Sequence, residues 1–581
     1  VIHPKRILQQ VVAGVRDYGN RMGIPTINGA VYFDDNYIGN PLVFCGCVGI
    51  IPRNKIEKDA KVGDAIVVMG GRTGRDGIHG ATFSSAELTD THADEFSHAV
   101  QIGNAITEKK MADVILQARD QNLFNSITDC GAGGLSSAIG EMGEKIGARV
   151  ELEKVPLKYA GLNYAEIWIS EAQERMVLAV PKEKVRQLLE LSRSEDVEAT
   201  VIGEFGTENS DLILNYQQQE VGRISMRFLH DGIPMPTRKA VISSENRAKP
   251  HGSAVGVSET RENLLKLLAH PNIASKHWII RQYDHEVQGG SVIKPLTGPL
   301  QIGPSDASVI RPKLNSNKGV VIACGLAPHI DDPYAMTIAS IDEAIRNAVA
   351  VGADPKQIAI LDNFCWPSVD DEQTMGTLVR ACEACRDAAL AYGIPFISGK
   401  DSLHNQFTNQ ETGQVIRIPR TLLISAIGVI DDVRKCITMD LKDARDGQLV
   451  LIAAKSQELP ALAAVHRAMA QAIDRGLISS AHDVSDGGML VAIAEMCIAS
   501  SLGAVLENID DAQLFAESCG RYIAEVRGEH LNELQQLISH HQAVIISLGR
   551  VSPDAKLVIK NRDWQIGIED ITRAWRGTLD W

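Results

Sequence analysis

Hydrophobic positions along the chain change repeatedly between two spacings, and the changes predict both strands and helices. Residues 320–328 (VVIACGLAP) and 357–367 (QIAILDNFCWP) are short apolar runs typical of buried strands. Between them, residues 340–355 carry Ala344 and Val349 at helical spacing and then reach a glycine that stops the helix. Strands that alternate with amphipathic helices predict an α+β or α/β protein whose helices pack on mixed sheets.

The same series of motifs occurs twice in the chain. Residues 16–29 (RDYGNRMGIPTING) align without a gap with residues 386–399 (RDAALAYGIPFISG), and each predicts a helix end, a Gly stop, a short strand and a Gly turn. Three more pairs follow in the same order: KDAKVGDAIVVMGG (58–71) with KDARDGQLVLIAAK (442–455), TDCGAGGLSSAIGEM (128–142) with HDVSDGGMLVAIAEM (482–496), and EAQERM (171–176) with ESCGRY (517–522). Four similarities in one order indicate a duplicated unit.

The repeat sets the expected domain boundaries. In each copy a strand-rich part precedes a part rich in βα units, and a Pro-, Ser- and Asn-rich connector separates the copies. The second copy has residues 275–385 before its RDAALAYGIP, whereas the first has only residues 1–15, so we expect the first copy to begin inside a domain. The expected divisions are 1–57, 58–205, the connector 206–274, 275–435, 436–552 and a tail at 553–581.

Composition and charge narrow the class of protein. The 581 residues are 44% hydrophobic and 23% charged, as in a globular enzyme, and the formal net charge is −15. An acidic chain has no general attraction for nucleic acid or anionic membranes, so any phosphate must be held locally. The sequence contains no signal peptide and no apolar run of membrane-span length, and its ten cysteines form no disulfide-like framework. These features predict a cytoplasmic protein that binds neither nucleic acid nor membrane.

Three segments of the first copy carry candidate chemistry. Asp129 follows an apolar strand and precedes the glycines of DCGAGG at the mouth of a helix, an arrangement that suits an anion and a metal ion. The Gly-rich loop GGRTGRDGIHGATFSS holds Arg72, Arg75 and His79, and it suits phosphate binding. ISEAQERM (169–176) places dense polar groups between apolar runs, which predicts the edge of a site. An N-capped turn, a flexible surface loop and an internal ion pair are the respective structural alternatives.

The second copy places polar residues at the ends of three predicted strands. GPSDASVIRP, LDNFCWPS and SGKDSLHN each end an apolar run with a carboxylate or an amide. Mg²⁺ favours a few carboxylates together with phosphate oxygens. We therefore predict that one nucleotide–magnesium site is shared by Asp306, Asp362, Asn363, Lys400, Asp401 and Ser402.

Seven motifs together resemble one enzyme family. GGRTGRDGIHGATFSSAE, AVQIGNAITEKK, TDCGAGGLSSAIGEMG, SEAQERM, RQYDHEVQGG, LDNFCWP and SGKDSL are similar to the synthetase subunit of phosphoribosylformylglycinamidine synthase, or FGAM synthetase, within the aminoimidazole ribonucleotide synthetase superfamily. The resemblance covers nearly the whole chain. It implies a tandem duplication of an ATP-binding-type domain and a C-terminal-type domain (A1-B1-A2-B2), with the first A domain incomplete.

The resemblance also implies a reaction, with ATP and Mg²⁺ as cofactors. In this family the amide oxygen of formylglycinamide ribonucleotide is phosphorylated by ATP, and ammonia then displaces phosphate from the iminophosphate. The ammonia comes from a glutaminase domain or subunit, and a small accessory subunit is a further expected partner. Two alternatives remain at this point, namely another superfamily enzyme such as selenide water dikinase, which has a single copy, and a non-catalytic nucleotide-binding scaffold.

Family site residues transfer only where the motifs match. The resemblance assigns substrate binding to Gln101, Glu171, Ala172, Gln173 and Ser402, ATP binding to Asp362 and Gly399, and magnesium binding to Asp129 and to the position of Lys400. Ala172 replaces a family Ser, and Lys400 replaces an Asn in many members; a protonated lysine does not ligate Mg²⁺. The family's catalytic histidines correspond to positions before Val1, so we expect this polypeptide alone not to turn over.

Overall fold

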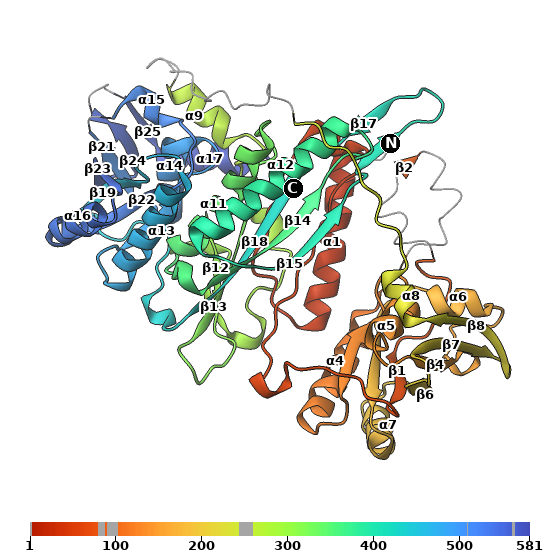
Figure 1. Cartoon of the computed structure of the whole chain (residues 1–581). Coiled ribbons are helices and arrows are strands. Elements are labelled where there is room, and N and C mark those ends of the chain that lie inside the picture. The colour runs from red at the N-terminus through yellow and green to blue at the C-terminus, as the bar shows by residue number, and fades with distance from the viewer. Residues whose placement is uncertain are drawn as a thin grey trace.

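The computed structural model describes residues 3–78, 88–89, 101, 103–242, 260–507, 509–560 and 564–581. Figure 1 shows two sheets at opposite ends of the molecule and a third sheet between them. We call them the first sheet (orange and olive), the central sheet (green and cyan) and the second sheet (blue). The end of the Gly-rich loop, including His79, lies outside the described residues.

The first and second sheets have the same topology. Each has seven strands, and the third strand in spatial order is the first of its sheet in the sequence. All neighbours are antiparallel except β4 with β7 and, at the same place, β21 with β24. In spatial order the strands are β3 (Ser126–Asp129), β5 (Arg175–Val180), β1 (Ala65–Gly70), β6 (Ala199–Phe205), β4 (Ala148–Glu151), β7 (Asp211–Tyr216) and β8 (Gln219–Ser225), matched by β20 (Ser480–Asp483), β22 (Arg521–Arg527), β19 (Gly447–Ala453), β23 (Val544–Ser552), β21 (Gly503–Leu506), β24 (Lys556–Ile559) and β25 (Trp564–Gly567). The duplication predicted from the motifs is confirmed.

Period-two alternation explains why helices cover both faces of the first sheet. In β1, Ile66 and Val68 pack in one core with α5 (Leu135–Met142) and α6 (Tyr164–Ile169). The residues between them, such as Val67, pack in a second core with α4 (Ala105–Asp120) and α7 (Val185–Ser194). The second sheet repeats this plan with α14 (Gly488–Ser500) on one face and α13 (Leu459–Asp474) and α16 (Leu531–His540) on the other.

Both outer sheets extend beyond the boundaries expected from the sequence. β7 and β8, followed by α8 (Met226–Asp231), fall in the expected connector, yet β7 pairs with β4 and completes the first sheet. β24 and β25 fall in the expected tail and complete the second sheet, and α17 (Ile568–Gly577) then packs on α9 (Thr260–Leu268). Residues 238–242 of the connector lie beside the start of α12 (Glu372–Tyr392), where the Val241 amide donates to the Glu372 carbonyl at 2.8 Å.

The central sheet has six strands and two long helices. Its order is β15 (Phe396–Ser402), β14 (Ile358–Cys365), β18 (Thr421–Ile430), β13 (Gly319–Gly325), β12 (Ser308–Ile310) and β9 (Ser291–Ile293). The helices α11 (Pro333–Ala350) and α12 (Glu372–Tyr392) pack against it, with Ala344 and Val349 fully buried as their spacing predicts. The strands predicted at 320–328 and 357–367 are β13 and β14.

The aligned segments 16–29 and 386–399 agree in their helix ends but not beyond them. α1 (Pro4–Met22) and α12 both end at a glycine in left-handed conformation, Gly23 with φ 67° and Gly393 with φ 70°. The strand predicted after the helix forms only in the second copy, as β15, where it pairs with β14. Residues 24–29 form no strand. The Thr26 amide donates instead to the Asp284 carbonyl. Among the described helices, none combines the length and apolar character needed to cross a bilayer.

Candidate active site

A chain of hydrogen bonds joins three of the residues assigned to substrate. The Gln173 side-chain amide donates to Gln101 Oε1 at 2.6 Å, and the Gln101 side-chain amide donates to Glu171 Oε2 at 2.9 Å. Glu171 is 5% exposed and Ala172 is fully buried. Gln101 and the triplet 171–173 are 70 residues apart in sequence, so the fold builds this cluster.

The glycines of DCGAGG approach the same cluster. The backbone amide of Gly133 donates to Glu171 Oε1 at 3.0 Å. Asp129 is the last residue of β3, beside this turn, and it is exposed. Its side chain lies along the glycines, since a Cβ on Gly131 would lie 2.9 Å from Asp129 Oδ2. Asp129 thus places carboxylate oxygens at the edge of the cluster, the kind of ligand that a hard metal ion takes.

Arg175 fixes the backbone of the triplet from inside the protein. Its guanidinium is buried and donates to the Ala172 carbonyl at 2.8 Å, to the Ser170 carbonyl, and to Thr73 Oγ1 at 2.8 Å. Burial lowers the pKa of Arg175 from its usual value. Because the carbonyls lie on both sides of Glu171, the arginine sets the direction of the Glu171 side chain.

A cavity of about 680 Å³ opens between α1 and these loops. Gln173 and Glu174 line it, together with Lys158. Further charged and polar groups come from α1, the Gly-rich loop and the start of α4: Asp17, Tyr18, Arg21, Arg72, Asp76 and Asn104. The arginines proposed for phosphate already have protein partners, since Arg72 pairs with Glu198 at 2.7 Å and Arg75 with Glu166 at 2.8 Å. Lys158 and Asp76 form a third ion pair at 2.9 Å.

Tyr18 is a residue of this cavity that the motifs do not identify. Its hydroxyl contacts Glu108 and lies 2.9 Å from Glu174 Oε1. Burial, followed by the bonds to Glu108 and Glu174, raises the pKa of Tyr18, and burial also raises the pKa of Glu174. A difference between the two copies marks this position, because the residue aligned with Tyr18 in the second copy is Ala388.

The structure brings together most, but not all, of the strand-end residues of the second copy. The parallel pairing of β14 with β15 sets Asp362 opposite Gly399 and Cys365 opposite Ser402. A Cβ on Gly399 would lie 2.6 Å from Asp362 Oδ1, so this approach requires glycine. Partial burial raises the pKa of Asp362, although backbone bonds, including one from Lys400, act in the opposite direction.

Lys400 and Asp306 depart from the predicted magnesium site in different ways. Lys400 is exposed on the edge strand β15 and offers a cation rather than a metal ligand. Asp306 precedes β12, which is separated from β15 by three strands. It is buried and bonded to the His482 ring at 2.8 Å and to the Asp483 amide at 2.9 Å. The prediction that Asp306 shares a site with Asp362 is therefore wrong, because strand order cannot be inferred from strand-end motifs.

Asp306 instead belongs to a buried ionic network between α11, β20 and α14. Arg346 donates to Asp483 Oδ2 at 3.1 Å and also pairs with Asp342. His482 contacts Asp306 through one ring nitrogen and Glu495, at 3.1 Å, through the other. Burial alone would lower the pKa of His482, but the carboxylates of Asp306 and Glu495 raise it well above its ordinary value.

Two groups in the second copy have ligand atoms close enough for one metal ion. Asp306, His482 and Asp483 form the buried group, and His329, Asp486 and Glu517 form a more exposed one, each with its ligand atoms within 4.8 Å of one another. In the buried group the Arg346 guanidinium already neutralises Asp483. In the exposed group Glu517 accepts the Gly487 amide at 2.8 Å, the counterpart of the bond between Gly133 and Glu171.

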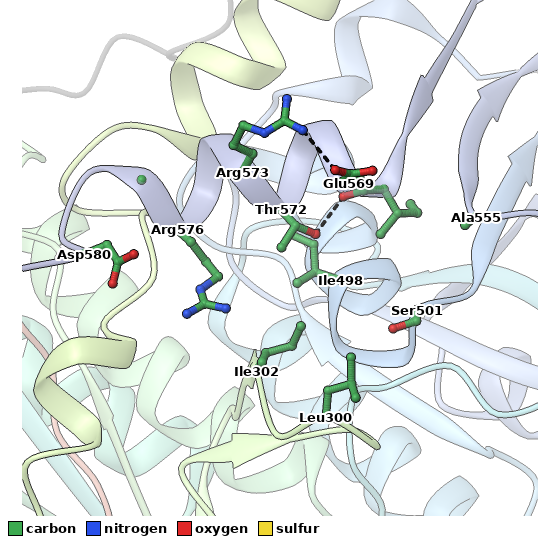
Figure 2. Close-up of a pocket in the computed structure, with 12 residues that line it drawn as sticks. Leu300, Ile302, Ile498, Ser501, Ala555, Glu569, Thr572, Arg573, Arg576 and Asp580 are labelled. Carbon is green, nitrogen blue, oxygen red and sulfur yellow. Dashed lines mark hydrogen bonds and ion pairs between the residues drawn. The ribbon is translucent and has the colours of Figure 1, made fainter.

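A second cavity, of about 530 Å³, lies between the segment of Leu300 and Ile302, the end of α14 and the helix α17. Figure 2 shows Leu300 and Ile302 on one side of it and Thr572 and Arg573 of α17 on the other, with Ile498 beside Thr572. Arg573 is paired with a neighbouring glutamate of α17. None of the residues assigned to substrate, ATP or metal lines this cavity, so it is separate from the candidate site.

A strand from the first copy joins a small three-stranded sheet built by the second copy. β2 (Leu88–Thr89) lies between the Gly-rich loop and Gln101 in the sequence, and it pairs in parallel with β16 (Gln406–Thr408). β16 follows Ser402 closely and also pairs with β17 (Val415–Arg417). Through Leu88 and Thr89 the first copy therefore contacts β16, the strand that follows β15 with its Gly399 and Ser402.

Comparisons with known proteins agree with this duplicated architecture. The chain matches AIR synthase related protein, N-terminal domain, over residues 2–51 and 304–430, and AIR synthase related protein, C-terminal domain, over residues 61–214 and 434–560. It is 31% identical over its full length to phosphoribosylformylglycinamidine synthase subunit PurL of Thermoplasma volcanium and covers 79% of that protein. Over 90% of its length it is 34% identical to the PurL subunit of Methanothermobacter thermautotrophicus, of which it covers 75%.

Solved structures show the same fold. A structure described as T. maritima PurL complexed with FGAR has a TM-score of 0.70 and 23% identity, covering 93% of this chain and 80% of that one. A structure described as PurLQS from Thermotoga maritima has a TM-score of 0.66 and 22% identity over the same shares. Other structures of the T. maritima protein are described as complexes with ATP and with AMPPCP.

Proposed function

The chain belongs to the family of phosphoribosylformylglycinamidine synthase subunit PurL, and from this premise we propose which of its residues serve the family reaction. The reaction is the ATP-dependent amidation of formylglycinamide ribonucleotide (FGAR) to formylglycinamidine ribonucleotide in purine biosynthesis, a ligase reaction. A single-copy superfamily enzyme and a non-catalytic scaffold are the alternatives that family membership removes.

FGAR binds at the cluster of Gln101, Glu171 and Gln173. The observation that supports this most is the hydrogen-bonded order of the three side chains, with Gln173 facing the cavity. Amide groups supply both donors and acceptors to a ribonucleotide amide, and Glu171 holds Gln101 in one orientation. Ala172 is buried and contributes packing rather than a hydroxyl contact.

ATP binds along β14 and β15. Asp362 and Gly399 lie opposite each other, and the absence of a side chain at Gly399 leaves the Asp362 carboxylate close to the backbone. Ser402, two residues beyond Lys400 on β15, lies between this position and β16, and it provides a hydroxyl contact to FGAR. Lys400 attracts phosphate oxygens as a cation.

Asp129 would hold Mg²⁺. Its exposed carboxylate at the end of β3 is a hard oxygen donor beside the glycine turn, which fits this ion. When bound, the ion neutralises charge on the transferred phosphoryl group. In the family reaction the FGAR amide oxygen attacks the γ-phosphorus of ATP and ADP leaves; ammonia then attacks the resulting iminophosphate carbon and phosphate leaves. The groups named above hold FGAR and ATP for these steps.

Ammonia comes from a glutaminase subunit, and a small accessory subunit is a further partner. The description of the T. maritima structure as PurLQS supports an assembly of several subunits in this family. The family reaction and the reducing environment expected from the cysteine pattern support a cytoplasmic location.

Calorimetric titration of the chain with FGAR tests the substrate site. We expect saturable binding that Gln101→Ala weakens by about tenfold, because the substitution removes both the contact to FGAR and the support from Glu171. Titration with ATP serves as the control and should give the same affinity for both proteins. Equal FGAR binding by the two proteins, or no FGAR binding by either, would overturn the assignment.

A further inference from the structure

Glu174 has a backbone conformation that glycine favours. Its φ is +56°, in the left-handed region, where an ordinary side chain is strained. The aligned position in the second copy, between ESC and RY, is Gly520 with φ +67°. The two copies thus share one backbone conformation, but the first copy carries a glutamate where the second carries the unstrained residue.

The Glu174 side chain connects segments that surround the candidate site. Its Oε1 accepts from the Tyr18 hydroxyl of α1 at 2.9 Å, and the backbone of Asn104, which caps α4, also bonds to its carboxylate. The Glu174 carbonyl accepts from the Gly71 amide of the Gly-rich loop at 2.7 Å. One residue therefore joins α1, the start of α4 and the Gly-rich loop to the segment that carries Glu171 and Gln173.

Tyr18, which donates to Glu174, is a second position at which the two copies differ. Tyr18 aligns with Ala388, which is fully buried in α12 and has no hydroxyl to donate. Tyr18 and Glu174 are 156 residues apart, and both differ in chemistry from their counterparts at the place where they meet. Both residues line the same cavity as Gln173. The pair is therefore a property of the first copy's site and not of the repeated fold.

We propose that Glu174 is a positioning residue for FGAR. It sets the loop of Gln173 against α1 and against the start of α4, whose cap Asn104 lies three residues after Gln101 in the sequence. The strained backbone is the cost of a carboxylate at this position. The inference rests on the proposed substrate site. It adds that the geometry of FGAR binding depends on Glu174, even though replacing this residue with glycine relieves backbone strain.

Glu174→Gly separates positioning from folding. The substitution relieves the left-handed strain, so the midpoint of thermal unfolding should stay the same or rise. The FGAR dissociation constant should rise about tenfold because the loop loses its tie to α1 and α4. The ATP dissociation constant should not change. Hydrogen exchange at the backbone amides of residues 103–108 should become faster, whether or not a ligand is present.

Two further variants serve as matched controls. Gln542→Gly removes an exposed side chain with φ +57° at the end of α16 in the second copy, so it relieves the same kind of strain without touching the site. It should leave FGAR binding and exchange at 103–108 unchanged. Tyr18→Phe combined with Glu174→Gly should bind FGAR no more weakly than Glu174→Gly alone, because the two changes break one shared bond.

Three results would overturn the inference: wild-type FGAR affinity in Glu174→Gly, unchanged exchange at 103–108, or a lowered unfolding midpoint that accompanies weaker binding. The last result would mean that Glu174 only stabilises the fold. Failure of the wild-type chain to bind FGAR would instead refute the proposed substrate site. In that case exchange at 103–108 in Glu174→Gly still decides whether Glu174 holds these segments together.

Discussion

The two copies of the repeated unit share a sheet and differ in what happens at its edge. Both have the same strand order, and in both a glycine amide donates to a glutamate, Gly133 to Glu171 and Gly487 to Glu517. The aspartates that precede these glycines, Asp129 and Asp483, differ in their surroundings. Asp129 is exposed at the end of β3, whereas Asp483 is buried and paired with Arg346.

The difference shows which interactions preserve a fold and which ones create a site. Backbone pairing and the arginine that holds the glutamate loop occur in both copies, as Arg175 and Arg521. Side chains at a few positions then decide whether the edge of the sheet is open for a ligand or closed by ion pairs. A fold constrained by its backbone therefore tolerates a change of role in one copy.

The largest expected difference is in stability at the aligned aspartates. Asp483→Ala leaves Arg346 buried with only part of its counter-charge, and we expect a loss of about 3–5 kcal/mol in the free energy of unfolding. Asp129→Ala removes an exposed side chain and should cost less than about 0.5 kcal/mol. Calorimetric unfolding of each variant measures both values. Similar losses would mean that the two sheet edges are equally closed.

A second comparison concerns ligand binding at the aligned glutamates. Glu171→Gln loses the charge that accepts from Gln101 and Gly133, so FGAR affinity should fall roughly 10- to 100-fold, as expected for a charge-assisted bond worth about 1.5–3 kcal/mol. Glu517→Gln changes the same repeat position without touching that cluster, and it should leave FGAR affinity unchanged. Calorimetric titration checks both variants. A loss of FGAR binding in Glu517→Gln would place substrate in the second copy.

Much of the fold follows from the sequence, but the sheet edges do not. The apolar runs at 320–328 and 357–367 identify β13 and β14, because buried strands need continuous hydrophobic surface. β8 (QEVGRIS) is a largely polar edge strand, so hydrophobicity does not distinguish it from a connector. Strand order is also absent from the motifs, which is why Asp306 was expected beside Asp362.

The candidate site was predictable where motifs carry it and not where distant contacts make it. Gln101, Glu171 and Gln173 come from motifs, and the structure places them in contact. Tyr18 meets Glu174 only because α1 packs on α4, a contact that no local pattern encodes. Differences between the aligned copies do mark both residues. Comparing internal repeats position by position therefore finds residues that motif matching misses.

The third comparison is in pH dependence. His482 has a pKa well above its ordinary value in the folded protein, so its stabilising contribution is complete below the unfolded pKa of about 6.5 and is lost as pH rises through the folded pKa. Stability of the second sheet should therefore fall by up to about 1.4 kcal/mol per pH unit above pH 6.5. The aligned residue in the first copy is Thr128, which does not titrate.

His482→Gln isolates this contribution, because glutamine retains a donor toward Asp306 but cannot be protonated. Unfolding of the variant, followed by calorimetry from pH 6 to pH 9, should lose the slope. A slope that persists in His482→Gln would assign the pH dependence to other groups of the network, such as Glu343, whose pKa burial raises to about 8.

The smallest effect should be equal in the two copies. Gly23 and Gly393 end α1 and α12 in the left-handed conformation, and a Cβ at either position would meet nothing within 4 Å. The cost of Gly23→Ala and Gly393→Ala then comes from backbone conformation alone, and it should be about 1 kcal/mol in each case. Exchange of the backbone amides in the last turn of each helix measures the two costs separately. Equal costs mean that the repeat conserves backbone conformation even where the following residues diverge into a strand in one copy and an irregular segment in the other; unequal costs would show that the divergence begins within the helix end itself.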